Sequence, residues 1–201
     1  MPSIYQLKPR FQNLLRPLVQ RLYRRGVTAN QVTLAAAGVS LLLGTLIAAF
    51  AGYLWLFALI PLWMLLRMAL NAIDGMLARD FGQQSRLGTF LNELCDVISD
   101  AALCLPFAFL PHFSWLPVAV VVFLATVSEM TGTVAVMVGA SRRYEGPMGK
   151  SDRALVFGAL GLAIGLALPP AAWQAVIFPG IAALLALTVA NRIRAALREA
   201  G

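Results

Sequence analysis

Long apolar runs are the feature that most restricts how this chain can fold. Six of them, each near the roughly 20 residues that a helix needs to cross a bilayer, take up most of the 201 residues. Only 12% of the residues are charged, against about 25% in an ordinary soluble domain. The sequence therefore predicts an all-α integral membrane protein with six transmembrane helices. The predicted spans are 29–52, 54–79, 88–110, 114–139, 152–168 and 172–194.

The basic residues predict the orientation of these helices. Of the 16 Lys and Arg residues, 15 lie before the first span, at the C-terminal end of the chain, or around the second and fourth connections. Because cytoplasmic loops carry an excess of Lys and Arg, this face, with both termini, is predicted to be cytoplasmic. We therefore expect the basic residues behind the net charge of +7 to contact anionic lipid. No nucleic acid is expected as a partner, since the basic residues follow the span ends.

The N-terminal segment, residues 1–27, mixes basic and apolar residues and contains no acid. This composition predicts an amphipathic interfacial helix that lies on the anionic leaflet. An ordinary positively charged topology anchor is the alternative, and both interpretations put the segment at the same surface. Residues 28–201 form the predicted membrane domain.

Five of the nine carboxylates lie within apolar runs. A charge there costs roughly 2.5–3.5 kcal/mol on translocon scales, so such residues suggest a functional site. In the third span Asn92, Asp96 and Asp100 recur every four residues, and these three positions share one helix face. Acids this close need cations, and oxygen ligands favour hard ions such as Mg²⁺, Mn²⁺ or Ca²⁺. The five acids are Asp74, Glu93, Asp96, Asp100 and Glu129.

Two roles besides metal binding stay open for these acids. Interhelical ion pairs, with Arg67 and Arg79 as the cations, would also neutralise two of them. A cation- or proton-coupled transporter would place polar residues along a path to the far side, whereas these cluster toward the cytoplasmic face. For Glu129 three roles remain: a distant metal ligand, an acceptor contact, or a partner for Arg67.

A motif joins the second and third spans. Residues 71–96 read N-x2-D-G-x2-A-R, eight residues, G-x3-N-x3-D. This resembles the signature of the CDP-alcohol phosphatidyltransferase family, D-x2-D-G-x2-A-R, eight or nine residues, G-x3-D-x3-D. Residues 28–33 also look like the family's T-P-N-x-x-T entry to the first helix, with Ala29 in place of the proline. The resemblance covers nearly the whole chain.

The resemblance implies a role for each motif residue. In the family the acids hold two divalent ions, Mg²⁺ or Mn²⁺, on the pyrophosphate of a CDP-linked donor, and the last acid, here Asp96, is the general base. Small residues leave room for a nucleotide beside the backbone, and an arginine fork grips phosphate. The implied metal ligands are Asp74, Asp96, Asn71 and Asn92, with Glu93 and Asp100 as additional acids. The implied donor-binding residues are Gly75, Ala78, Arg79, Gly88, Asn30 and Thr33.

Two positions depart from the family pattern, because Asn71 and Asn92 stand where it has the first and third aspartates. An asparagine offers one neutral carbonyl oxygen and no charge. Two divalent ions carry +4, and the two remaining motif aspartates supply only −2. We therefore expect Glu93 and Asp100 to compensate. A two-metal enzyme, a one-metal enzyme and a catalytically altered relative all remain open.

The fourth connection, residues 141–153, is rich in glycine and basic residues. Such a segment, at the N-terminus of the fifth span, predicts an acceptor pocket for a phosphorylated alcohol; ordinary positive-inside charge is the alternative. The resemblance implies transfer of a phosphatidyl group from CDP-diacylglycerol to a small alcohol, with release of CMP. Glycerol 3-phosphate or another phosphorylated polyol is the expected acceptor. A homodimer in a bacterial inner membrane, with a cytoplasmic active site, is also implied. The predicted acceptor-binding residues are Arg142, Arg143, Lys150 and Arg153.

Overall fold

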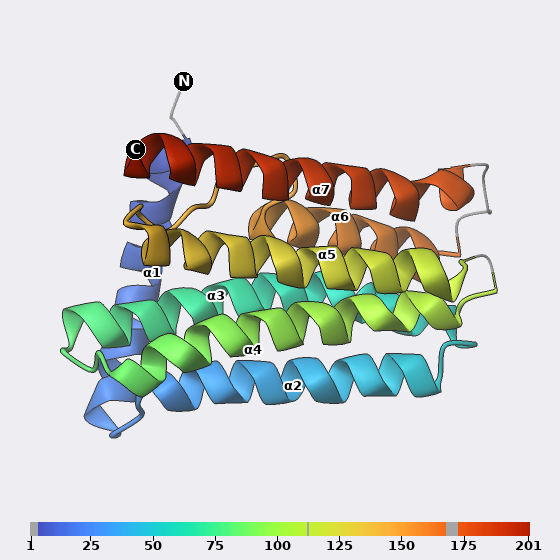
Figure 1. The fold of residues 1–201 in the computed structure, drawn as a ribbon. Helices are drawn as coiled ribbons and strands as arrows, with labels where there is room; N and C mark the ends of the chain where they lie inside the picture. Colours follow the sequence, from blue (N-terminus) through green and yellow to red (C-terminus); the bar gives the residue numbers. More distant parts are fainter. Residues whose placement is uncertain (1–3, 112, 168–172) are drawn as a thin grey trace.

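The computed structural model describes residues 4–111, 113–167 and 173–201, and in this part of the chain it contains helices and no strands. Most of the helices run side by side, and the N-terminal one crosses one end of the bundle (Figure 1). The α-helices are α1 (Ile4–Arg24), α2 (Ala29–Ala49), α3 (Leu59–Asp80), α4 (Arg86–Cys104), α5 (Trp115–Val134), α6 (Lys150–Gly165) and α7 (Trp173–Ala200). Short 3-10 helices are η1 (Leu54–Ala58), η2 (Leu105–Phe109) and η3 (Ala135–Val138).

Each of the six predicted spans corresponds to one of α2 to α7, and the largest difference is at the C-terminal end, where α7 continues to Ala200 beyond the predicted end at 194. The third span continues beyond α4 as a 3-10 helix with Pro106 near its start, because proline cannot donate the backbone hydrogen bond of an α-helix. The fourth span also continues as a 3-10 helix, η3, and this helix ends at Gly139, whose backbone has a left-handed conformation. The predicted ends at 168 and 172 lie outside the described residues.

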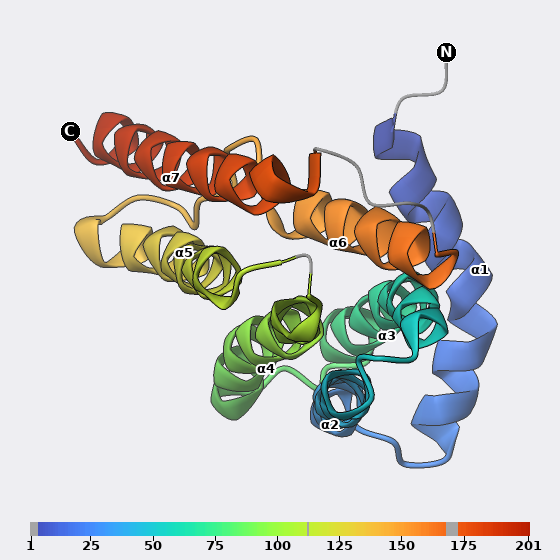
Figure 2. The same ribbon diagram turned by 90° about the vertical axis from the view of Figure 1, so that its right-hand side faces the viewer.

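Length and composition alone mark four segments of the described chain as able to cross a membrane: Ala29–Ala49, Leu54–Asp80, Trp115–Val138 and Ala175–Ala200. The helix α6 has only 16 residues, and α4 carries several of the intramembrane acids. Both nevertheless run alongside the other four in the bundle (Figures 1 and 2).

The N-terminal segment forms helix α1, which packs across the end of the bundle where α3 ends (Figure 1). Leu15, Val19 and Leu22 follow the i, i+4, i+7 spacing of one helix face, and they pack against buried residues of α2 and α3. Arg16 Nη2 lies 3.2 Å from Asp80 Oδ2. The helix is therefore attached to the bundle by both apolar and ionic contacts.

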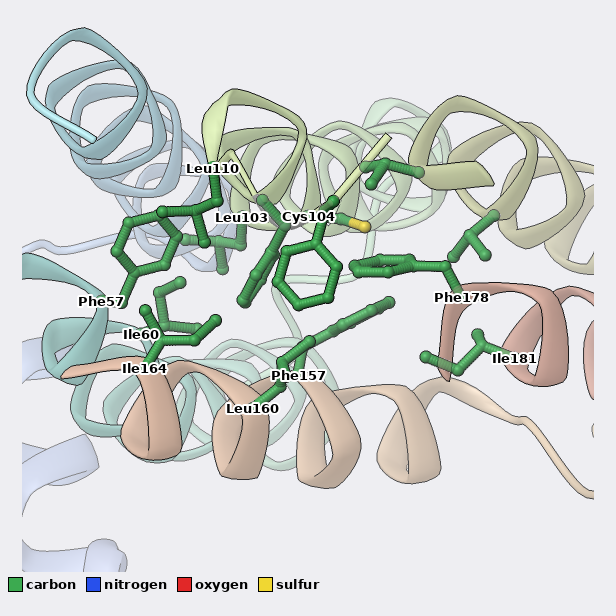
Figure 3. Packing of buried hydrophobic residues seen from close by; sticks show 14 of the residues in the cluster. Phe57, Ile60, Leu103, Cys104, Leu110, Phe157, Leu160, Ile164, Phe178 and Ile181 are labelled. Atoms are coloured by element: carbon green, nitrogen blue, oxygen red, sulfur yellow. The ribbon is translucent and has the colours of Figure 1, made fainter. Parts of the chain in front are cut away.

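The apolar core fills the half of the bundle that is far from α1. Phe107 is completely buried and packs against Phe57, Phe157 and Phe178, with ring centroids 5.3 to 6.1 Å apart. These rings come from η1, η2, α6 and α7, together with aliphatic side chains such as Leu103 and Ile164 (Figure 3). This core holds the helices in place, and the polar residues gather at the α1 end.

Candidate active site

The entry to α2 is fixed by hydrogen bonds at its first turn. Thr28 caps the helix: its Oγ1 accepts from the Gln31 backbone N–H at 3.2 Å, and Gln31 Oε1 accepts from the Thr28 N–H at 2.9 Å. This capping box satisfies donors that the helix leaves unpaired. Gln83, in the α3–α4 connection, accepts from the Ala29 N–H at 2.7 Å. The start of α2 is thereby attached to the segment that joins the two motif helices.

A polar cavity of about 660 Å³ lies where α2, α3 and α4 meet at the α1 end. All six residues predicted to bind the CDP donor line it, together with three of the predicted metal ligands. The structure thus brings one complete predicted group to a single space. The lining residues from the motif and its surroundings are Asn30, Thr33, Asp74, Gly75, Ala78, Arg79, Gly88, Asn92 and Glu93.

Two glycines make room in this cavity. A Cβ at Gly88 would lie 2.8 Å from Asn30 Oδ1, and a Cβ at Gly75 would lie 3.0 Å from the Arg79 guanidinium. Both distances are shorter than an ordinary van der Waals contact, so a side chain would displace Asn30 or Arg79. The glycines of the motif therefore allow the polar groups of Asn30 and Arg79 to approach the helix backbones.

Asp74 is buried on α3, and its Oδ2 accepts a hydrogen bond from Thr33 Oγ1 at 2.7 Å. Among the described residues no cation lies within ion-pair distance of this carboxylate. The other four intramembrane acids each have such a cation in the same part of the chain, whereas Asp74 faces the polar cavity with Gly75 and Arg79. A carboxylate without a paired cation is the natural place for a metal ion to bind.

Asp96, in contrast, is surrounded by donors. Its Oδ1 accepts from Arg67 at 3.0 Å and from Asn71 Nδ2 at 3.3 Å, while its Oδ2 pairs with Lys150 Nζ. Arg67 also bonds the Asp96 main-chain oxygen at 3.1 Å. Asn71 and Asp96 are therefore in direct contact, and cations from α3 and α6 bind the same carboxylate.

Asp100 and Glu129 belong to a deeper network of buried ions. Asp100 pairs through Oδ1 with Arg67 at 2.6 Å and through Oδ2 with Arg153 at 2.8 Å. Glu129 pairs with Arg153 at 3.0 Å and with Arg142 and Arg192 at 3.5 Å. The suggested pair of Glu129 with Arg67 is therefore wrong, because Arg67 reaches α4 and Glu129 faces α6 and α7. Interhelical ion pairing, one of the roles left open for the acids, describes this part of the site.

The four cations of the predicted acceptor pocket are spread over different partners. Arg142 pairs with Glu93, and Lys150 pairs with Asp96. Arg143 turns to the surface acids Glu145 and Glu199; its hydrogen bond lowers the pKa of Glu145, which in turn raises the pKa of Arg143. Arg153 has a side chain only 2% exposed. Lys150, with 37% of its side chain exposed, is the most accessible of the four, and it pairs with the motif residue Asp96.

Lys150 and Arg67 also line a second space, a mostly apolar groove of about 630 Å³ between α3 and α6. Leu65, Met68 and Leu155 form part of its wall and are exposed on the outer surface of the bundle. Asn71 and Asp100 lie at its polar end. The groove therefore connects an apolar surface of the bundle with the donors that hold Asp96.

Sequence reasoning missed several residues of the site. Arg86 and Gln83 line the polar cavity within the eight-residue stretch that the motif leaves unspecified. Arg192 resembles an ordinary basic flank in the sequence, yet it is 1% exposed and bonds Glu129 and the main-chain oxygens of Ser128 and Glu145. Its position at the end of the last apolar run was the available signal.

The donor set limits how a metal ion can bind. No group of three His, Cys, Asp or Glu side chains in the described residues comes together as a metal site. Asp74 supplies a free carboxylate, and Asn92 bonds Glu93 through Nδ2 at 3.4 Å, which leaves its amide oxygen available. A carboxylate and an amide oxygen beside an open polar cavity suit a hard cation that keeps water or substrate oxygens as its other ligands.

A family model for CDP-alcohol phosphatidyltransferases matches residues 26–191, which include the motif and both cavities. The chain belongs to the CDP-alcohol phosphatidyltransferase family. The membership confirms the resemblance found in the motif and makes the protein a member of a family of CDP-alcohol phosphotransferases.

Similar proteins agree with this assignment. Inner membrane protein YnbA of Escherichia coli is 47% identical over 195 residues, which are 97% of this chain and 96% of that protein. Phosphatidylinositol phosphate synthase of Corynebacterium glutamicum is 31% identical over 103 residues, which are 51% of this chain and 45% of that protein. This second alignment therefore covers about half of each chain.

The fold is that of phosphatidylinositol phosphate synthase from Mycobacterium tuberculosis. Its crystal structure with CDP-DAG bound has a TM-score of 0.75 at 19% identity, over 90% of this chain and 92% of that chain. A crystal structure of the same enzyme with manganese and citrate gives 0.74 at 20% identity, over 90% and 88% of the two chains. The prediction of an all-α fold is confirmed for the described residues.

Proposed function

We propose that this protein transfers a phosphatidyl group from CDP-diacylglycerol to a small phosphorylated alcohol and releases CMP. The observation that carries the proposal is the polar cavity, because it collects all six predicted donor-binding residues around the free carboxylate of Asp74. The related M. tuberculosis enzyme has been crystallised with CDP-DAG, which supports the same donor here.

The two cavities fit the two ends of such a donor. Arg79 and Arg86 line the polar cavity, and planar guanidinium groups bind phosphate oxygens in pairs. The apolar groove between α3 and α6 opens on exposed leucine and methionine side chains. It suits the acyl chains, which gain free energy by staying out of water. A lipid with a water-soluble head can therefore bind with its head at the motif.

Asp96 is the proposed general base and Lys150 the acceptor-binding cation. Lys150 is 37% exposed and pairs with Asp96 Oδ2. A phosphate group on the acceptor competes for the same ammonium group, and its binding would release Asp96 Oδ2. The freed oxygen then accepts the proton of the attacking hydroxyl group, which must lie within hydrogen-bond reach. Arg67 and Asn71 continue to hold Oδ1 and so keep the carboxylate oriented.

The cofactor in this proposal is Mg²⁺ or Mn²⁺. Asp74 and Asn92 are the residues that would hold it, and it would supply positive charge to the diphosphate as CMP leaves. The manganese in the M. tuberculosis enzyme supports this choice. Glu93 remains a predicted additional ligand, although Arg142 pairs with it here. Asp100 is less suited than the sequence suggested, because arginines hold both of its oxygens.

The names of relatives support the acceptor class. Two relatives of this chain are phosphatidylinositol phosphate synthases, which favours a phosphorylated polyol over a neutral alcohol. The proposal also includes six membrane-spanning helices, with α1 on the membrane surface. It places the protein in an inner membrane as a homodimer, with the site and both termini on the cytoplasmic side. The inner-membrane name of the E. coli relative supports the location.

The test is CMP release from CDP-diacylglycerol by the purified protein, with Mg²⁺ or Mn²⁺ and a panel of acceptors. The panel contains inositol phosphate, glycerol 3-phosphate, and the corresponding alcohols without phosphate. We expect release that depends on both the metal and a phosphorylated acceptor. Release that survives complete chelation, or that is absent with every acceptor, contradicts the proposal. The Asp96→Asn variant, which keeps the shape of the side chain, should be inactive.

A further inference from the structure

Arg67 is a buried cation beside the motif, at a position that the family pattern does not include. It lies one helical turn before Asn71 on α3, and 6% of its side chain is exposed. A guanidinium group stays protonated in proteins. A buried charge that cannot be neutralised needs opposite charge close to it. Arg67 must therefore hold carboxylates in every state of the enzyme.

The two carboxylates that it holds are Asp96 and Asp100, at 3.0 and 2.6 Å. Lys150 has a side chain that is 37% exposed and can leave Asp96 for water, whereas the buried Arg67 cannot. Asp100 also balances Arg153, so little of its charge is left for Arg67. The charge of Asp96 is then largely committed to Arg67. A divalent ion bound to Asp96 would also be repelled by the positive charge of Arg67, which binds the same carboxylate.

The polar cavity contains a separate and smaller set of oxygen ligands. Asp74 has no paired cation among the described residues, Asn92 is neutral, and Glu93 pairs with Arg142. Asp74 and Asn92 line this cavity, whereas Asn71 lines the apolar groove between α3 and α6. The two motif asparagines thus line different cavities, and neither supplies a negative charge. One free aspartate fits one divalent ion.

We infer that the protein binds a single divalent ion, at Asp74, and that Arg67 provides at Asp96 the positive charge that a second ion would bring. Arg67 acts as a positioning residue, because it holds the carboxylate that receives the proton. The two asparagines are consistent with this arrangement, since the loss of two acids matches the loss of one divalent cation. The inference rests on the proposed function only for the role of Asp96.

The number of bound ions tests the inference without turnover. Purified full-length protein in detergent is titrated with Mn²⁺ alone, and bound Mn²⁺ is counted from the loss of the free-ion signal in electron paramagnetic resonance. We expect one Mn²⁺ per chain for the parent and at least a tenfold weaker affinity for Asp74→Asn. Two ions or none in the parent, or unchanged affinity in Asp74→Asn, would overturn the inference.

A matched pair of double variants tests the part played by Arg67. Arg67→Gln with Asn71→Asp removes the cation and restores an acid, so a second Mn²⁺ should bind. Arg67→Lys with Asn71→Asp restores the same acid but keeps a cation, and it should still bind one. Equal stoichiometry in the two variants contradicts the role of Arg67. If the first does not fold, as judged by size-exclusion chromatography, the parent and Asp74→Asn titrations decide.

The results also separate this inference from the proposed function. A parent that binds one Mn²⁺ but releases no CMP with any acceptor overturns the proposed function alone. A parent that releases CMP and binds two Mn²⁺ overturns the single-ion inference alone.

Discussion

Replacing Glu129 with glutamine should destabilise the protein strongly, because this carboxylate is the counter-charge of three arginines. It is 8% exposed and lies within 3.0 to 3.5 Å of Arg142, Arg153 and Arg192. Removing one partner of a buried ion pair costs roughly 3–5 kcal/mol. The lower end applies here, since Arg142 keeps Glu93 and Arg153 keeps Asp100. We expect a loss of about 3 kcal/mol.

For a chain of this size, that loss corresponds to a decrease in the melting temperature of roughly 6–12 °C. Thermal unfolding in detergent, followed by intrinsic tryptophan fluorescence, measures it. The matched control is Glu145→Gln, the same chemical change in a surface pair with Arg143, which should cost less than about 1 kcal/mol. If Glu129→Gln melts at nearly the same temperature as the parent yet loses activity, Glu129 is a substrate or metal residue and the structural argument is refuted.

Three further predictions concern the site and its surface. Asp74→Asn should abolish metal-dependent CMP release, while Asp80→Asn, on the same helix but paired with an exposed arginine, should keep most of it. Lys150→Ala should raise the KM for the phosphorylated acceptor at least about tenfold, since a charge-assisted contact contributes roughly 1.5–3 kcal/mol. The KM for CDP-diacylglycerol should stay nearly unchanged, and an equal rise in both KM values would contradict the role of Lys150 in acceptor binding. Because Arg143 lowers the pKa of Glu145, the pair contributes stability above the usual carboxyl pKa of about 4.3 and loses it as the pH falls through the lowered pKa. The small difference in melting temperature between the parent and Glu145→Gln should therefore disappear in acid, and a difference that grows there would show that the pair is not the cause.

The sequence by itself predicted the helices and the donor end of the site. Apolar runs of the right length can form only helices in a bilayer, where each backbone group must find its partner within the segment. The motif residues Asp74, Gly75 and Arg79 are also close together along one helix, so their common position follows from helical geometry. Gly88, in the first turn of α4, lines the same cavity, because only residues 81–85 connect α3 to α4.

Only the tertiary structure decided which cation neutralises which acid. Arg67 reaches Asp96 and Asp100 on the next helix, whereas Glu129 is matched with Arg153 and with Arg192 from the last helix. The sequence shows on which face of its helix each charge lies, but not which helices are neighbours or how each is rotated about its axis. Burial makes these choices matter, because a charge inside the bundle is stable only beside an opposite one. The pairing, and with it the charge left at Asp74 for a metal ion, depends on the packing of helices that are distant in the chain.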